Sequence, residues 1–371
     1  MEAKIEILDC ESNDTIANDD LFNITSWGAD PSVRELIAQY KDGDIEKPEL
    51  QRKYVWTKKE ASRFIESLLL GLPVPSIFLA NMESGKRLII DGYQRLRTLY
   101  DFIEEGIWHG DDTKFNLIDS DIINKRWRGL SFSELSETDK RRLKNYTIHS
   151  ILFEQKHPSD DSGLFQVFER INTSGKTLNN QEIRNCVYQG SLNSLLFKLN
   201  VNKEWRELVG TEKEDDRMLD LELILRFFAM DSENIYKSSK KQTVLKQLLN
   251  DYMKDNKNAS EDIIASLEKK FTIVIDFIFK HIGHEAFFNL QNDLSKLRKK
   301  LHPTVFDSIM IATSIALERG YEYKGENLSE RRINLLKDSS YRNSILQATM
   351  QSSNINNRIK LALNYLYNFD L

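Results

Sequence analysis

The fold of the first half of this chain is decided by the stretch Leu88-Ile89-Ile90-Asp91-Gly92-Tyr93-Gln94-Arg95-Leu96-Arg97-Thr98-Leu99. Its three leading apolar residues predict the end of a buried strand, and the Asp-Gly pair predicts a sharp turn. After the turn, apolar residues recur at helical spacing, at Leu96, Leu99, Tyr100 and Ile103. The stretch therefore predicts a strand that leads directly into a helix.

Cationic side chains occupy the first turns of this predicted helix. Gln94, Arg95 and Arg97 lie near the end that carries free backbone N–H groups and a partial positive charge, where acids are normally favoured. Two arginines at this end predict a bound anion, a phosphate held by the helix N-terminus and by the guanidinium groups. The alternative is that both arginines face solvent or pair with acids such as Asp101 and Glu104.

The composition indicates a globular protein. The chain has 371 residues, of which 29% are charged and 40% hydrophobic, and its formal net charge is -5. This balance excludes a wholly basic DNA-coating protein but leaves room for a local basic groove. No apolar run approaches the roughly 20 residues that a membrane helix needs, and no signal peptide is recognisable, so we expect a cytoplasmic protein with no membrane partner.

The distribution of residue types along the chain predicts three parts. We expect residues 1–20 to form an acidic tail or edge segment, residues 21–190 an α+β domain with a small mixed sheet, and residues 191–371 an all-helical domain. In the α+β part we expect a helix with Asp30 as its N-cap, a Thr57–Glu60 capping box, a hairpin of strands 77–80 and 87–90, a strand over 146–153, and a helix opened by Asn179 and Glu182.

Two short runs are rich in cations. An irregular insertion over 107–130 contains Lys125-Arg126-Trp127-Arg128, a composition that suits contact with a nucleic-acid backbone or, alternatively, a solvated face. The second run, Lys296-Leu297-Arg298-Lys299-Lys300, has the same two interpretations and is expected to lie at the end of a helix.

Metal-binding and nuclease patterns are weak in this sequence. His281 and His284 lie three residues apart, but no third ligand with fitting spacing accompanies them, so we expect no zinc site. Asp215, Asp216 and Asp220 could form the acidic centre of a nuclease, although helix capping explains the same acids more simply. Cys10 and Cys186 fit no metal or redox spacing and are expected to be plain thiols.

Three separated motifs together resemble one known family. They are Gln51-Arg52-Lys53-Tyr54-Val55-Trp56, the Asp91-Gly92-Tyr93-Gln94-Arg95 turn, and Phe168-Glu169-Arg170-Ile171-Asn172-Thr173-Ser174-Gly175 followed by Leu178 and Gln181-Glu182-Ile183-Arg184. In order and spacing they resemble the N-terminal domain of GmrSD-type restriction enzymes, a group similar to the ParB and sulfiredoxin fold. The resemblance covers roughly residues 30–190.

The resemblance implies a nucleotide-binding module, one that hydrolyses nucleotides in some relatives, used in bacterial defence against foreign or modified DNA. It implies that Asp91, Gln94 and Arg95 handle a nucleoside triphosphate, with Asp91 holding Mg²⁺ or accepting a hydrogen bond. Tyr93 departs from the family, which has glutamine there. The departure removes an amide that could orient water, whereas a tyrosine could stack on a base or pack in the core.

Further residues are expected to complete the nucleotide site. Gly92 would allow a phosphate to approach the backbone closely, Arg97 would add positive charge, and Gln51 and Arg52 would face the turn from an extended segment. Asn172 and Gly175 would close the site from a second loop. The alternative for Gln51, Arg52 and Asn172 is that their side chains bond to buried backbone groups around the turn.

The sequence therefore predicts an NTP phosphohydrolase that associates with DNA, with modified phage DNA as one candidate substrate, in a restriction-type defence system. No histidine has the acidic or amide context of an HNH nuclease, so cutting is expected from a separate effector or nuclease subunit. A homo-oligomer is a further candidate assembly. The alternative function is a non-catalytic DNA or protein sensor that recruits an effector.

Overall fold

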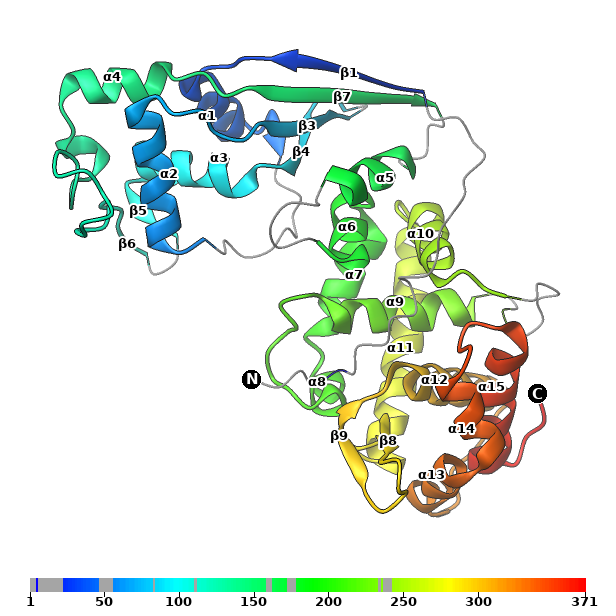
Figure 1. Cartoon of the computed structure of the whole chain (residues 1–371). Coiled ribbons are helices and arrows are strands. Elements are labelled where there is room, and N and C mark those ends of the chain that lie inside the picture. The colour runs from blue at the N-terminus through cyan, green and yellow to red at the C-terminus, as the bar shows by residue number, and fades with distance from the viewer. Residues whose placement is uncertain are drawn as a thin grey trace. The chain divides into compact units, whose positions relative to one another are not determined.

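A computed structural model shows that the chain divides into two compact units (Figure 1). We call residues Asp20–Val187 the sheet unit, and residues Met1–Asp19 together with Tyr188–Leu371 the helical unit. The structure describes residues 5, 23–46, 56–82, 84–109, 112–157, 162–171, 178–232, 235 and 242–371.

The sheet unit is built on a mixed five-stranded sheet in the order β1-β7-β3-β4-β2. Strands β3 and β4 form the predicted antiparallel hairpin, while β3–β7 and β4–β2 pair in parallel and β1–β7 in antiparallel fashion. This topology confirms the predicted α+β class with a small mixed sheet. The strands are β1 (Asn23–Ala29), β2 (Ile45–Glu46), β3 (Ile77–Asn81), β4 (Arg87–Asp91) and β7 (Ser150–His157).

Six α-helices accompany this sheet in the described part of the unit, and the sequence signals at their starts are mostly confirmed. Thr57 and Glu60 form the predicted capping box of α2, and Asn179 and Glu182 cap α6 in the same reciprocal manner. The predicted N-cap Asp30 is wrong, because the hydroxyl of Ser32 caps α1 instead. The helices are α1 (Val33–Asp42), α2 (Lys58–Leu70), α3 (Tyr93–Tyr100), α4 (Glu137–Asn145), α5 (Ser162–Ile171) and α6 (Asn180–Val187).

The main core of the sheet unit lies between one face of the sheet and helices α1–α4 (Figure 1). Ile77, Leu79, Ile89 and Leu152 point into it, as the two-residue period of the strands requires. The neighbouring strand residues Leu88, Ile90 and Phe153 are also buried, and α5 contacts β4. The sheet is therefore covered on both faces, which explains why its central strands are continuously apolar.

Two local predictions in this unit were wrong or incomplete. The strand expected over 146–153 starts only at Ser150, because Tyr146 ends α4 and Thr147 pairs with Ser32 as an isolated bridge. The irregular insertion contains a short β5–β6 hairpin and the buried ring of Trp127. Its elements are β5 (Ile107–Trp108), β6 (Thr113–Lys114) and the 3₁₀ helix Phe132–Glu134, and a π-helical turn, Asp101–Glu105, directly follows α3.

The helical unit confirms the predicted change of character, with one exception. Residues Lys296–Lys300 do not end a helix but fall in the turn and second strand of a hairpin, β8–β9, joined to the helices by the turn before α12. The elements of the helical unit are α7 (Ser191–Asn200), α8 (Lys203–Val209), α9 (Leu219–Asp231), α10 (Leu245–Asp255), α11 (Glu261–His281), β8 (Phe288–Leu290), β9 (Leu297–Leu301), α12 (Pro303–Glu318), α13 (Leu328–Lys337), α14 (Ser339–Leu346) and α15 (Ser352–Tyr367).

A buried ion pair joins two central helices of this unit. The guanidinium Nε of Arg226 on α9 lies 3.0 Å from Asp307 Oδ1 on α12, and both side chains are almost fully buried. Ile5, the described residue of the predicted acidic tail or edge segment, is buried and forms a parallel bridge with Leu301 of β9. That residue therefore packs on the helical unit instead of extending into solvent.

Candidate functional site

The candidate site is the turn between β4 and α3. Asp91 is the last residue of β4, and Gly92 adopts a left-handed conformation with φ 105° at the N-cap of α3. A Cβ atom at Gly92 would lie 2.8 Å from Cγ1 of Ile77, at the start of β3. Glycine is thus required here both by the backbone angle and by the neighbouring strand, whether or not a phosphate approaches.

Arg95 folds back over this turn. Its Nη2 lies 2.5 Å from Asp91 Oδ2 and donates a hydrogen bond of 3.0 Å to the carbonyl oxygen of Ser76. The Arg95 side chain is 12% exposed and the Asp91 side chain 39% exposed. The carboxylate therefore remains accessible to solvent while it neutralises the guanidinium group.

Gln94 connects the same turn to the start of α2. Its side-chain oxygen accepts a hydrogen bond of 3.3 Å from the backbone N–H of Trp56. No acidic residue lies in the first turn of α3, and within the described part of the chain no side chain caps it. The amide end of the helix thus keeps the partial positive charge on which the predicted anion site depends.

Tyr93 and Arg97 lie on the inner side of α3, away from this turn. Tyr93 is buried in the core and hydrogen-bonded to Tyr40, and burial raises its pKa. Of the two alternatives for this tyrosine, the structure shows packing. Arg97 Nε lies 2.7 Å from Asp101 Oδ1, so the alternative of pairing with a nearby acid describes this arginine.

Asp101, expected from the sequence as a candidate partner for an arginine, is also a buried acid. Its carboxyl group is completely buried at the first position of the π-helical turn, and the Arg97 guanidinium is the cation beside it. Burial outweighs this attraction and raises the pKa of Asp101 to about 7. The spacing of four residues from Arg97 was the signal in the sequence that could have identified the pair.

The structure thus brings Asp91, Gly92, Gln94 and Arg95 together at one turn and directs Tyr93 and Arg97 elsewhere. The remaining predicted members of the nucleotide site, Gln51, Arg52, Asn172 and Gly175, lie outside the described residues.

The basic run of the sheet unit is largely committed to contacts within the chain. Arg126 Nη2 lies 2.9 Å from Asp139 Oδ2, and Arg128 Nη1 lies 2.8 Å from Asp121 Oδ1. Trp127 is buried, so its ring packs in the core and does not face solvent beside the cations. Lys125 is exposed. The DNA contact expected at these residues remains a prediction.

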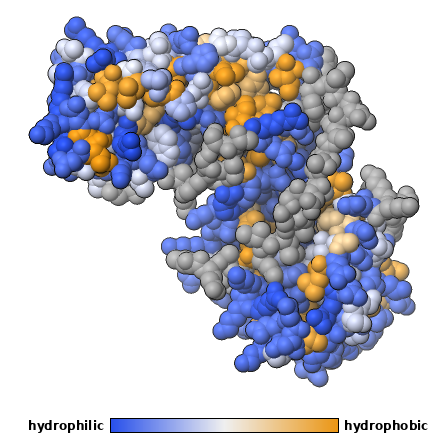
Figure 2. Space-filling model, viewed as in Figure 1, coloured by the Kyte–Doolittle hydropathy of each residue, from blue (hydrophilic) through white to orange (hydrophobic). Residues whose placement is uncertain are grey.

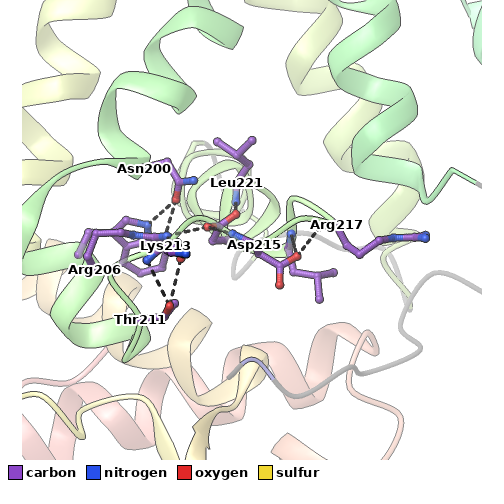
Figure 3. Close-up of polar contacts among 10 residues, drawn as sticks. Asn200, Arg206, Thr211, Lys213, Asp215, Arg217 and Leu221 are labelled. Atoms are coloured by element: carbon purple, nitrogen blue, oxygen red, sulfur yellow. Dashed lines mark hydrogen bonds and ion pairs between the residues drawn. The ribbon is translucent and has the colours of Figure 1, made fainter. Parts of the chain in front are cut away.

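Two of the acids considered for a nuclease centre, Asp215 and Asp220, form hydrogen bonds within the loop that precedes α9 (Figure 3). Asp220 is completely buried, and its carboxylate accepts hydrogen bonds from Arg206 Nη1 and from the backbone N–H groups of Asp215 and Leu221, each at 2.9 Å. Asp215 Oδ1 in turn accepts from the N–H of Arg217 at 2.8 Å and of Leu219 at 3.3 Å. These contacts use the two carboxylates to hold the loop before α9 and its first turn. The first-turn acid Asp220 is as predicted, whereas the N-cap position itself is Met218, whose side chain does not cap the helix.

Metal ligands do not gather in the part of the chain that the structure describes. Within it, no three His, Cys, Asp or Glu side chains lie close enough together to hold a metal ion. His281 stacks on Tyr323, with ring centroids 4.0 Å apart. His302 is buried beside Thr304, and burial lowers its pKa to about 4.

No helix among the described residues is both long enough and apolar enough to span a bilayer.

Comparison with known proteins identifies the family of the sheet unit. Residues 33–189 match the family model described as the GmrSD restriction endonuclease, N-terminal domain. The comparisons with curated proteins and with solved structures gave no match. The matched region contains both the sheet and the Asp91–Arg95 turn. Residues 33–189 are therefore a GmrSD-type N-terminal domain, a domain of restriction endonucleases.

Proposed function

We propose that the Asp91–Arg95 turn binds the phosphates of a nucleoside triphosphate together with Mg²⁺, and that the protein is an NTP-hydrolysing, DNA-associated component of a restriction-type defence against phage. The observation that supports this proposal is the start of α3, where the N-terminal end of the helix, the Arg95 guanidinium and a partly exposed carboxylate lie together without an acid in the first turn.

The residues of the turn suit three roles. Arg95 exchanges its contacts with Asp91 and the Ser76 carbonyl for a phosphate oxygen, which accepts a charge-assisted hydrogen bond. Asp91, once released from Arg95, would be the residue that supplies a carboxylate oxygen to Mg²⁺, which usually takes one or two protein carboxylates and otherwise water and phosphate. Bound Mg²⁺ would neutralise charge that develops on the phosphates. Gln94 orients the attacking water through its amide.

Gln51, Arg52, Asn172 and Gly175 complete the nucleotide site in this proposal. The nuclease that cuts DNA is a separate subunit. In this proposal His302 is not a nuclease residue, because a buried histidine whose pKa is lowered to about 4 is unsuited to activate water.

Nucleotide binding and turnover test this function directly. We expect the native protein to bind Mg²⁺–NTP in calorimetry and to release phosphate, faster with DNA than without, and we expect Arg95→Ala to weaken binding at least tenfold. Arg34→Ala, at an exposed arginine in the first turn of α1, is the matched control and should leave binding unchanged. If native protein and Arg95→Ala both fail to bind any nucleotide, the proposed site is refuted.

One observation favours a second candidate function, a non-catalytic sensor of DNA or protein that recruits an effector. Tyr93 is buried and therefore offers the turn no polar group in place of the family's glutamine. A turn of this kind could hold a phosphate without hydrolysing it. Nucleotide binding with no phosphate release under any DNA condition would select the sensor over the hydrolase.

A further inference from the structure

The β8–β9 hairpin of the helical unit is fixed firmly at its base. The backbone N–H of His302 donates a hydrogen bond of 2.9 Å to the carbonyl of Phe287. Arg332, which is almost fully buried on α13, donates from Nη1 to the carbonyl oxygens of Glu285, Ala286 and Phe288, at 2.6, 3.3 and 3.2 Å. These bonds hold the two strands in one orientation on the helices.

The hairpin carries more positive than negative charge. Lys296, Arg298, Lys299 and Lys300 fall within five consecutive residues, while Asp293 is the acid of the connecting loop. The Asp293 carboxylate accepts hydrogen bonds from the N–H and hydroxyl of Ser295, at 3.1 and 2.8 Å, and so serves the turn.

The three lysines of this hairpin have no ionic partner among the described residues. Lys296 and Lys299 are exposed, Lys300 is partly exposed, and no described acid lies within ion-pair distance of any of them. Arg298 Nη2 donates to Asn292 Oδ1 at 2.6 Å, which joins the second strand to the loop. As far as the described residues go, the hairpin thus presents three lysines without an ionic partner on strands that hydrogen bonds hold to the helices.

The other basic run of the chain differs in this respect. Its two arginines, Arg126 and Arg128, pair with Asp139 and Asp121, and the aromatic ring between them is buried. Ion pairs of this kind must be broken or shared before the arginines can neutralise a phosphate, whereas the hairpin lysines release only bound water and counterions.

We propose that the β8–β9 hairpin contacts the phosphate backbone of duplex DNA through Lys296, Lys299 and Lys300. This inference rests on the DNA association in the proposed function and assigns it a surface. Duplex DNA presents about one negative charge per 1.7 Å of helix axis, so several closely spaced cations bind it together, and a two-stranded ribbon is of a size that the major groove admits. The helical unit is largely hydrophilic on the face in Figure 2.

Salt-dependent DNA binding by the full chain tests this assignment. We compare native protein with Lys296→Gln/Lys299→Gln/Lys300→Gln by fluorescence anisotropy on a labelled duplex at several salt concentrations. We expect the variant to bind at least tenfold more weakly at low salt. For the variant, the slope of the logarithm of the binding constant against the logarithm of the salt concentration should be smaller in magnitude by about 2–3. Each lost phosphate contact removes about 0.9 from this slope.

Two further variants serve as comparisons. Lys269→Gln/Lys324→Gln/Lys360→Gln removes the same charge from exposed lysines elsewhere in the helical unit and should keep the native slope. Lys125→Ala/Arg126→Ala/Arg128→Ala should change the slope less than the hairpin variant does. Circular dichroism confirms that each variant is folded.

The outcomes separate this inference from the proposed function. A hairpin variant with the native affinity and slope overturns the hairpin assignment but leaves DNA association intact. A native protein that binds no duplex at low salt overturns both, while the nucleotide assay still decides the Asp91–Arg95 site. Equal binding of polyglutamate and duplex would overturn the assignment to DNA.

Discussion

Arg95 Nη2 lies 2.5 Å from Asp91 Oδ2, so the last residue of β4 neutralises a cation in the first turn of α3. The pair explains how an arginine is tolerated at a helix end that normally disfavours positive charge. It also means that an anionic ligand at this turn competes with a carboxylate already in place.

The Asp91→Asn variant separates the two roles proposed for Asp91. Asparagine cannot neutralise Arg95, so affinity for NTP without Mg²⁺ should rise severalfold, because the ligand no longer competes with a carboxylate. The gain in affinity that Mg²⁺ provides in the native protein should shrink about tenfold or more, since a carboxylate ligand is lost. Calorimetry with and without Mg²⁺ measures both effects. An Mg²⁺ dependence equal to the native one would remove Asp91 from the metal site.

Gly92→Ala should destabilise the sheet unit by about 1–3 kcal/mol from backbone strain alone, with a further cost from the contact with Ile77. Gly85→Ala is the matched control, because Gly85 also has a positive φ, of 81°, but a Cβ there meets nothing within 4 Å. Chemical denaturation measures both. Equal losses of unfolding free energy would show that the approach to Ile77 does not constrain the turn.

Asp101 should make the stability of the sheet unit depend on pH. Its pKa is raised from 3.8 to about 7 by burial, so between these values the folded protein retains a proton that the unfolded chain has released. The stabilising contribution is therefore complete below about pH 4 and is lost as the pH rises to about 7. Asp101→Asn should flatten this part of the profile of unfolding free energy, whereas Asp119→Asn, at an exposed acid, should leave it unchanged.

Asp220→Ala should cost the helical unit about 3–5 kcal/mol, because it leaves Arg206 buried without its carboxylate. Asp216→Asn, at an exposed neighbour, should change the unfolding free energy by less than about 0.5 kcal/mol. Denaturant titration measures both variants. Metal-dependent plasmid nicking by the native protein that disappears in a folded Asp220→Asn variant would contradict the structural role.

The elements of the sheet unit were predictable wherever local signals and hydrophobic period agreed. The strand–turn–helix at Gly92 and the capping boxes at Thr57 and Asn179 depend on residues within one or two turns of each other. Ser32 took the capping role expected of Asp30 because its hydroxyl, and not the Asp30 carboxylate, reaches the N–H of Glu35.

The candidate site was predictable only in part, since ion pairing depends on geometry. The sequence placed Arg95 and Arg97 in one cationic cluster, but residues two apart on a helix point in nearly opposite directions, and each arginine found its own carboxylate. The β8–β9 hairpin was missed because the apolar residues Leu297 and Leu301 are separated by cations that imitate the last turn of a helix.

Gln94 contacts the backbone of Trp56, two residues before α2, and Arg95 contacts the backbone of Ser76, directly before β3. A ligand that binds both side chains would therefore break the contacts that hold the start of α2 and the start of β3. The indole of Trp56 lies next to the start of α2, in edge contact with the ring of Phe64. Trp56 is one of the five tryptophans of the chain, and its contribution to the fluorescence emission should change when a ligand binds at the turn.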